Sequence, residues 1–308
     1  MVWNCCDPLS PYLFLIAAEG LLSLIKDSAK KGKLQGFAAR NGPKVTNLFF
    51  ADDCLIFCRA QNSDCRELMS ILRTYGKASG QEINVGKSSI LYSKNTRDRE
   101  KQITMKILGI RRSLDQEKYL GLPLLFGRSK KRELRSMKEK LWARIHSWRG
   151  RLLSQEGRAI KIQAVRQSIP LYVMSCFKLP RGFIHELNML MDGFWWGDTG
   201  DKRKIHWKHW ELLCCSKLDG GLGFKELESF NMALLAKQWW RLMQNETSLC
   251  FKVLKAKYFP RFDAKWAKTG QKAFYLWNSL IQGKKWLIKG HFGELKMVRG
   301  LTSGLING

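Results

Sequence analysis

The sequence has no apolar run long enough to span a bilayer, and Met1 begins neither a secretory leader nor a transit peptide rich in Arg and Ser. A secreted or membrane-spanning protein is therefore not expected. Its nine cysteines are an odd number, which does not suit a disulfide framework. We expect reduced thiols in an intracellular protein of the nucleus or cytosol, with no membrane partner.

Acidic residues are scarce. The chain has 26 Asp and Glu against 54 Lys and Arg, which leaves a net charge of +28. The imbalance is greatest over residues 101–180, where 19 basic residues meet 5 acidic ones. A solvated basic surface is one interpretation, but an excess of this size favours a polyanionic partner, most simply nucleic acid.

One short stretch, residues 48–57, places two adjacent carboxylates, Asp52 and Asp53, inside an otherwise apolar run. Burying an unpaired charge is costly, so the pattern predicts a hairpin of two short strands with Asp-Asp as its tight turn. Carboxylates at a hairpin tip suit a hard cation such as Mg²⁺, which completes its shell with water and substrate phosphate. The alternative is an ordinary turn in which Asp serves local hydrogen bonding.

Capping residues and apolar periodicity predict the other elements. A helix is expected from an N-cap at Ser10 to Gly32, and another from Ser63 to Gly80. Strands are expected at 34–40, 45–50 and 54–58, and later helices at 134–148, 154–169 and 183–195. Six tryptophans are expected to anchor a helical core: Trp195, Trp196, Trp207, Trp210, Trp239 and Trp240.

Two groups of possible metal ligands occur in the sequence. Cys54 and Cys58 fall on one strand face without a second ligand pair nearby, which favours packed thiols. His206 and His209 with Cys214 and Cys215 lack the spacing that wraps one zinc ion, so no zinc is predicted.

Several motifs occur in an order that resembles the reverse transcriptases of plant non-LTR (LINE-type) retrotransposons. They are Asp7-Pro8-Leu9-Ser10-Pro11, Phe50-Ala51-Asp52-Asp53, Ser79-Gly80-Gln81-Glu82-Ile83-Asn84 with Lys87-Ser88, Tyr119-Leu120-Gly121-Leu122-Pro123, Phe194-Trp195-Trp196-Gly197 and Gly220-Gly221-Leu222-Gly223-Phe224. The similarity extends over about residues 7–290.

The resemblance implies an α+β fold, a partial polymerase palm of antiparallel strands and helices followed by mostly helical regions. The expected domains are a palm at 1–125, a basic helical thumb at 126–180, a Trp-rich helical extension at 181–290 and a frayed tail at 291–308. In the family, the fingers and a strand with a third catalytic carboxylate lie upstream of the part matched here. The resemblance therefore implies a truncated chain that is inactive alone.

The resemblance also implies roles. RNA-directed DNA synthesis would use two Mg²⁺ ions on Asp52 and Asp53, with RNA template, DNA primer and deoxynucleotide triphosphates as partners. Lys87 would protonate pyrophosphate, although an exposed surface lysine is the alternative. Nucleotide and template would meet Cys5, Cys6, Asp7, Pro8 and Ser10, with Cys5 and Cys6 replacing the family's Gln and Gly. Tyr119, Leu120 and Gly121 would grip the primer. Nucleic acid would bind Lys130, Lys131, Arg132, Arg135, Lys138, Arg144, Arg158 and Lys161.

Two functions of different classes follow. One is a polymerase segment whose activity needs the upstream half. The other is a non-catalytic basic module that binds nucleic acid.

Overall fold

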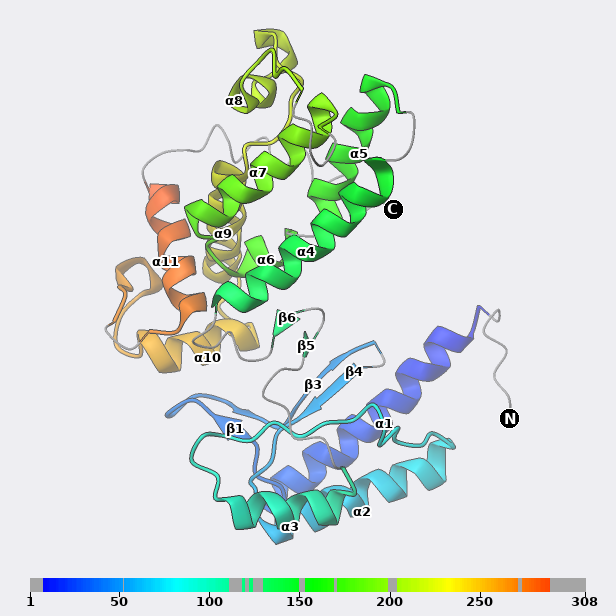
Figure 1. Ribbon diagram of the computed structural model, residues 1–308. Helices are drawn as coiled ribbons and strands as arrows, with labels where there is room; N and C mark the ends of the chain where they lie inside the picture. Colours follow the sequence, from blue (N-terminus) through cyan, green and yellow to red (C-terminus); the bar gives the residue numbers. More distant parts are fainter. Residues whose placement is uncertain are drawn as a thin grey trace. The chain divides into compact units, whose positions relative to one another are not determined.

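The computed structural model describes residues 8–51, 53–110, 118–119, 122–123, 130–149, 153–168, 171–198, 204–270 and 273–288 (Figure 1). The chain divides into two compact units, residues 1–117 with 252–257, and residues 118–251 with 258–308. Helices dominate both, and the described strands form three two-stranded antiparallel sheets. The predicted α+β class is confirmed.

The described part of residues 1–117 contains the helices α1 (Ser10–Lys30), α2 (Asn62–Ser79) and α3 (Asp98–Leu108). Helix α2 packs against both of the others. Its core joins Ile25 of α1 to Leu68 and Ile71 of α2. The predicted N-cap at Ser10 is wrong by one residue, because Leu9 takes the cap position and Ser10 begins the helix. The predicted end of α2 is confirmed, since Gly80 takes the left-handed conformation typical of a C-cap, with φ of 70°.

The expected strand at 45–50 is divided between two hairpins. Strand β1 (Phe37–Ala38) pairs with β2 (Lys44–Val45), and β3 (Asn47–Phe50) pairs with β4 (Asp53–Ile56). Val45 is buried opposite Phe37, whereas Phe49 packs on the core of α1 and α2. The chain therefore changes its pairing partner at Thr46.

The described part of the second unit contains further helices. They are α4 (Lys130–Arg149), α5 (Gln155–Ser168), α6 (Leu171–Cys176), α7 (Arg181–Trp196), α8 (Trp210–Cys214), α9 (Leu227–Gln244) and α11 (Tyr275–Ile288). Helix α10 (Leu249–Tyr258) contributes residues 252–257 to the first unit, and β5 (Lys118–Tyr119) pairs with β6 (Leu122–Pro123). The predicted helices at 134–148, 154–169 and 183–195 correspond to α4, α5 and α7.

Aromatic side chains fill much of the core of the second unit. The Trp277 ring is fully buried and stacks on Tyr258 at 4.5 Å and on Phe259 at 5.6 Å between ring centroids. Trp195, Trp210 and Trp239 are buried as predicted. The prediction is wrong for Trp207 and Trp240, which are 77% and 41% exposed. Successive helical side chains point about 100° apart, so Trp239 and Trp240 of α9 cannot both face the core.

The Gly220-Gly221-Leu222-Gly223-Phe224 motif serves packing in this fold. A Cβ on Gly221 would lie 2.2 Å from the Cys215 carbonyl oxygen, so the backbone approaches too closely for a side chain. Phe224 is 1% exposed, and its ring stacks on Trp210 at 5.3 Å. The glycines therefore let Phe224 enter the core.

Candidate functional site

The hairpin of β3 and β4 carries the carboxylates that the sequence singles out. Phe50 pairs with Asp53, so the turn consists of Ala51 and Asp52. The prediction of Asp-Asp as the turn is therefore wrong by one residue. Ala51 has a φ of 49°. Positive φ at the first central residue is typical of the turns that close two-residue hairpins. Asp52 itself lies outside the described residues, and Asp53 begins β4 with an exposed side chain.

The two faces of this hairpin differ. Phe49 and Ile56 pack on the core of α1 and α2. Leu48 and Phe50 on the other face are 39% and 58% exposed. Because side chains of cross-strand partners lie on the same face, Asp53 shares the exposed face with Phe50. The carboxylate is thus reachable from the side that the first unit leaves open.

We expect this hairpin to be a weakly protected part of the first unit. Among the described residues, β3 and β4 pair only with each other, so both outer edges of the sheet lack strand partners. A two-stranded sheet is only marginally stable in water. Hydrogen exchange should therefore show faster exchange for residues 45–58 than for α4 or α7, which pack in the second core. Equal protection of the three segments would contradict this prediction.

Lys87 lies in a turn that Asn84 closes. The Lys87 N–H donates to Asn84 Oδ1 at 3.0 Å, and the Ser88 hydroxyl donates to the Asn84 carbonyl at 2.8 Å. The Lys87 side chain is exposed and makes no ion pair with the residues that the structure describes. Its catalytic role stays a prediction.

The other residues assigned by resemblance fall only partly within the described chain. Pro8 is exposed just before α1, and Ser10 begins that helix. Tyr119 pairs with Leu122 in the hairpin of β5 and β6. Five residues of these two groups lie outside the described residues: Cys5, Cys6, Asp7, Leu120 and Gly121.

Helix α4 has exposed basic side chains outside its buried side. Leu134, Leu141 and Ile145 are buried on its inner face. Arg135, Lys140 and Arg144 are exposed, and Lys138 forms an ion pair of 2.6 Å with Glu186 of α7. Lys130, Lys131 and Arg132 form its first turn, but their side chains lie outside the described residues.

Arg158 of α5 makes a contact that the sequence did not indicate. Its Nη1 donates to the Trp195 carbonyl oxygen at 3.1 Å. This carbonyl lies in the last turn of α7, where unpaired carbonyls attract a cation. The half-buried guanidinium therefore stabilises the end of α7, and its nucleic-acid role stays a prediction, as does that of half-buried Lys161.

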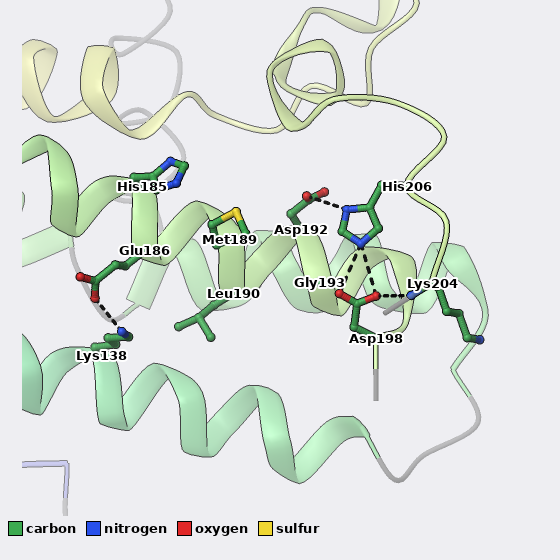
Figure 2. A pocket seen from close by; sticks show the side chains of 10 residues that line it. All are labelled: Lys138, His185, Glu186, Met189, Leu190, Asp192, Gly193, Asp198, Lys204 and His206. Atoms are coloured by element: carbon green, nitrogen blue, oxygen red, sulfur yellow. Dashed lines mark hydrogen bonds and ion pairs between the residues drawn. The ribbon is translucent and has the colours of Figure 1, made fainter. Parts of the chain in front are cut away.

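A polar cluster on α7 borders a cavity of about 620 Å³ (Figure 2). His206 Nδ1 lies 3.0 Å from Asp192 Oδ2, and His206 Nε2 lies 3.3 Å from Asp198 Oδ2. Burial raises the pKa of the Asp192 carboxyl, and His206 partly offsets this effect. The described lining residues include no hydroxyl or thiol nucleophile. The cluster therefore fastens the segment around His206 to α7.

The cysteines that the structure describes make local contacts at different places in the fold. The Cys58 thiol hydrogen-bonds with the Cys65 thiol, and this contact and burial raise the pKa of Cys58. Cys215 Sγ donates to the Glu211 carbonyl oxygen at 3.5 Å, within α8 and its C-cap. Within the described ranges, no three His, Cys, Asp or Glu side chains are grouped to hold a metal ion. The prediction about zinc stays a prediction.

None of the described helices is long and apolar enough to cross a membrane.

Comparisons with known proteins place the hairpin in a family context. Residues 7–124 match the family model of the reverse transcriptase (RNA-dependent DNA polymerase), and this segment contains Asp52, Asp53 and Lys87. The chain is 41% identical over 124 residues to the uncharacterized mitochondrial protein AtMg00310 of Arabidopsis thaliana, 40% of this chain and 80% of that protein.

Two other Arabidopsis thaliana proteins are similar over smaller shares of their length. The putative ribonuclease H protein At1g65750 is 37% identical over 137 residues, which are 44% of this chain and 22% of that protein. The uncharacterized mitochondrial protein AtMg01250 is 44% identical over 48 residues, 15% of this chain and 39% of that protein. The chain thus belongs to the family of AtMg00310, and its residues 7–124 are a reverse transcriptase domain.

Proposed function

We propose that this chain works as part of a LINE-type reverse transcriptase, as the second half of a palm, a thumb and the start of a C-terminal extension. The observation that carries the proposal is the β3–β4 hairpin, which lies inside the matched reverse transcriptase segment and ends in the Ala51-Asp52 turn. RNA template, DNA primer and deoxynucleotide triphosphates are its proposed partners.

The donor set of the hairpin tip fits magnesium. Mg²⁺ prefers carboxylate oxygens and keeps several waters, and Asp53 is exposed at the start of β4. Bound there, two Mg²⁺ ions would activate the primer 3′ hydroxyl and neutralise the departing phosphates. We propose that Asp52 is the ligand nearer the ions and Asp53 a more peripheral one. Two like charges at one turn repel each other, so a cation stabilises the ionised pair.

The thumb role is proposed for the exposed basic face of α4. Arg135 lies on one flank of the helix and Lys140 and Arg144 lie on the opposite flank, all outside its buried side, so they can contact phosphates without disturbing the core. Binding of this kind releases counterions and depends steeply on salt, with little sequence preference.

We expect a fourfold Gln variant of α4 to bind a primer–template duplex more weakly. The substitutions are Lys130→Gln, Lys131→Gln, Arg135→Gln and Lys138→Gln. Each lost phosphate contact should lower the slope of log affinity against log salt by about 1. Fluorescence anisotropy across a salt series measures both quantities.

The matched control removes the same charge from exposed positions elsewhere in the second unit. It carries Lys208→Gln, Lys217→Gln, Arg261→Gln and Lys268→Gln. Its salt slope should stay close to that of the unmodified chain. An affinity of the unmodified chain that does not change with salt, or equal losses in both variants, would refute the assignment of α4.

The second candidate function is a nucleic-acid-binding module without catalysis. Its supporting observation is that the basic face of α4 belongs to the second unit and the carboxylate hairpin to the first, so binding does not require the hairpin. The two candidates differ in one result, since only the polymerase loses its function when Asp52 loses its charge.

A nuclear or cytosolic location is part of the proposal. Two of the relatives are named as mitochondrial proteins, which makes the mitochondrion the alternative. Microscopy of the chain fused to a fluorescent protein distinguishes the two.

A further inference from the structure

A basic groove runs along α2 in the first unit, apart from every residue to which a role was assigned above. It encloses about 380 Å³. Its lining consists of three cations, two hydroxyls and two apolar side chains: Arg66, Arg73, Lys77, Ser70, Thr74, Met69 and Ile107.

The helical period explains why these side chains lie together. Positions 66, 70, 73 and 77 follow one another at steps of three or four residues, so they form one row along α2, and Thr74 lies at the edge of that row, next to Ser70 and Lys77. All five are exposed. Leu68 and Ile71 point the other way into the core, while half-buried Met69 and Ile107 line the bottom of the groove. The packing of α2 against α3 thus fixes a rigid row of cations.

The lining residues that the structure describes include no carboxylate. Arg66, Arg73 and Lys77 make no ion pair with the residues that the structure describes. Neighbouring helices behave differently, since Lys31 pairs with Asp27 at 2.6 Å and Lys101 with Asp98 at 2.8 Å.

The acidic side chains of α2 are engaged elsewhere. Asp64 accepts a hydrogen bond from the Gln35 N–H at 3.1 Å, and Glu67 accepts one from the Ser28 hydroxyl at 2.9 Å. Both bonds join α2 to the end of α1 and the segment after it. The acids of this helix therefore do not neutralise its basic face.

We propose that this groove, which we name the α2 groove, binds the phosphate backbone of a nucleic-acid strand. Arginine forks match phosphate oxygens in two parallel hydrogen bonds, and the hydroxyls of Ser70 and Thr74 can donate to further oxygens. Arg66 and Lys77 are separated by about 16 Å of helix rise. That length covers about five steps of a strand at about 3.4 Å each.

This site lies in the unit that carries the catalytic hairpin, whereas the α4 face lies in the other. Its binding requires neither Mg²⁺ nor catalysis. We infer that the chain holds nucleic acid at two separate surfaces, one in each unit.

The test measures binding of a fluorescent 20-nucleotide RNA to the full chain by anisotropy across a salt series. The variant combines Arg66→Gln, Arg73→Gln and Lys77→Gln. Its Kd should rise at least about tenfold, and its salt slope should fall by about 2 to 3. Ultraviolet cross-linking of the unmodified chain should label peptides that contain residues 66–77.

A matched control combines Lys26→Gln, Lys30→Gln and Lys33→Gln, which remove the same charge from exposed positions at the end of α1 and just beyond. Its Kd should change less than about threefold. Equal losses in both variants, or cross-links absent from 66–77, would overturn the proposal. Both variants must unfold at the same denaturant concentration as the unmodified chain. If the α2 variant does not, Lys77→Gln alone replaces it, and its salt slope should fall by about 1, whereas an unchanged slope would overturn the proposal.

Two further arms separate the possible causes. Poly-glutamate and unlabelled RNA are compared as competitors of the fluorescent RNA. If poly-glutamate displaces the fluorescent RNA from the α2 groove as effectively as unlabelled RNA does, the groove binds acidic protein segments instead. The fourfold α4 variant is measured in parallel. If only the α4 variant loses RNA affinity, the proposal for the α2 groove is wrong. If only the α2 variant loses RNA affinity, the assignment of α4 is wrong and the α2 groove is supported.

Discussion

Replacing Asn231 by leucine should lower the free energy of unfolding of the second unit by about 3 kcal/mol or more. Asn231 is a buried residue of α9, 1% exposed. Its Oδ1 accepts a hydrogen bond from the Leu179 N–H at 2.8 Å, and its Nδ2 donates to the carbonyl oxygens of Met174 and Phe177 at 2.8 and 3.0 Å. Leucine has a similar volume but leaves these three backbone groups without that partner, at about 1 to 3 kcal/mol for each buried group.

The effect should be large because the segment between α6 and α7 depends on few side chains. Ser279 of α11 accepts a hydrogen bond from the Lys178 N–H at 2.9 Å, and the Tyr275 hydroxyl donates to the Lys178 carbonyl oxygen. Asn231 of α9 makes three further hydrogen bonds to the same segment and the end of α6. Its loss would loosen the junction of α6, α7, α9 and α11 in the core of the second unit.

Denaturant unfolding followed by tryptophan fluorescence measures this change, because all but one of the 12 tryptophans lie beyond residue 140. Gln244→Leu at the exposed end of α9 is the control and should change stability by less than about 0.5 kcal/mol. If Asn231→Leu unfolds at the same denaturant concentration as the control, the role assigned to Asn231 is wrong.

The 308-residue chain by itself should extend no primer. The two-metal mechanism needs two ions about 3.5 to 4 Å apart. Asp53 stands at the start of β4, and Asp52, outside the described residues, is its neighbour in sequence, so one hairpin would supply both carboxylates. A carboxylate from a second strand is needed between the ions, and by resemblance the family supplies it upstream of the part matched here.

A labelled primer on an RNA template, with Mg²⁺ and deoxynucleotide triphosphates, measures this activity. The product should be indistinguishable from that of a sample without protein. Extension by the unmodified chain would show that our account of the incomplete site is wrong.

Elements with local signals could be predicted from the sequence. A helix is predicted at 183–195, and α7 spans Arg181–Trp196 and ends at Gly197, which takes a φ of 79°. The helix predicted at 154–169 corresponds to α5, and the hydroxyl of Ser154 just before it accepts a hydrogen bond from the Gly157 N–H at 3.3 Å. Such signals depend on residues within one turn of each other.

The shift of the hairpin turn by one residue had no such signal. Alanine seldom takes positive φ, so the sequence does not indicate a turn at Ala51. Two adjacent Asp residues do indicate a turn, because Asp is a common turn residue. The strand pairing determines the position of the turn. Phe49 packs on the core and Phe50 pairs with Asp53, which leaves residues 51 and 52 between the strands.

Contacts between distant residues were also beyond sequence patterns. Asn231 meets a segment more than 50 residues away, and Arg158 meets Trp195 across 37 residues. The α2 groove has no signal in the net charge of its region, because residues 1–100 carry 14 basic and 10 acidic residues, which nearly balance. Only the folded helix shows that its acids and its unpaired cations lie on different faces.

The most direct test of the reverse transcriptase assignment is complementation. The fingers and first half of the palm from an intact relative are joined to this chain, Gln and Gly replace Cys5 and Cys6, and extension of a primed RNA template with Mg²⁺ is measured. The completed protein should extend the primer. Asp52→Asn should reduce the rate at least about a hundredfold, because the mechanism loses several kcal/mol of metal stabilisation.

Asp53→Asn should cost less, and Asp219→Asn, at an exposed position of the second unit, should have no effect. This order of losses is what metal binding by the hairpin predicts. Full activity in the Asp52→Asn protein would contradict the assignment of that carboxylate as a metal ligand.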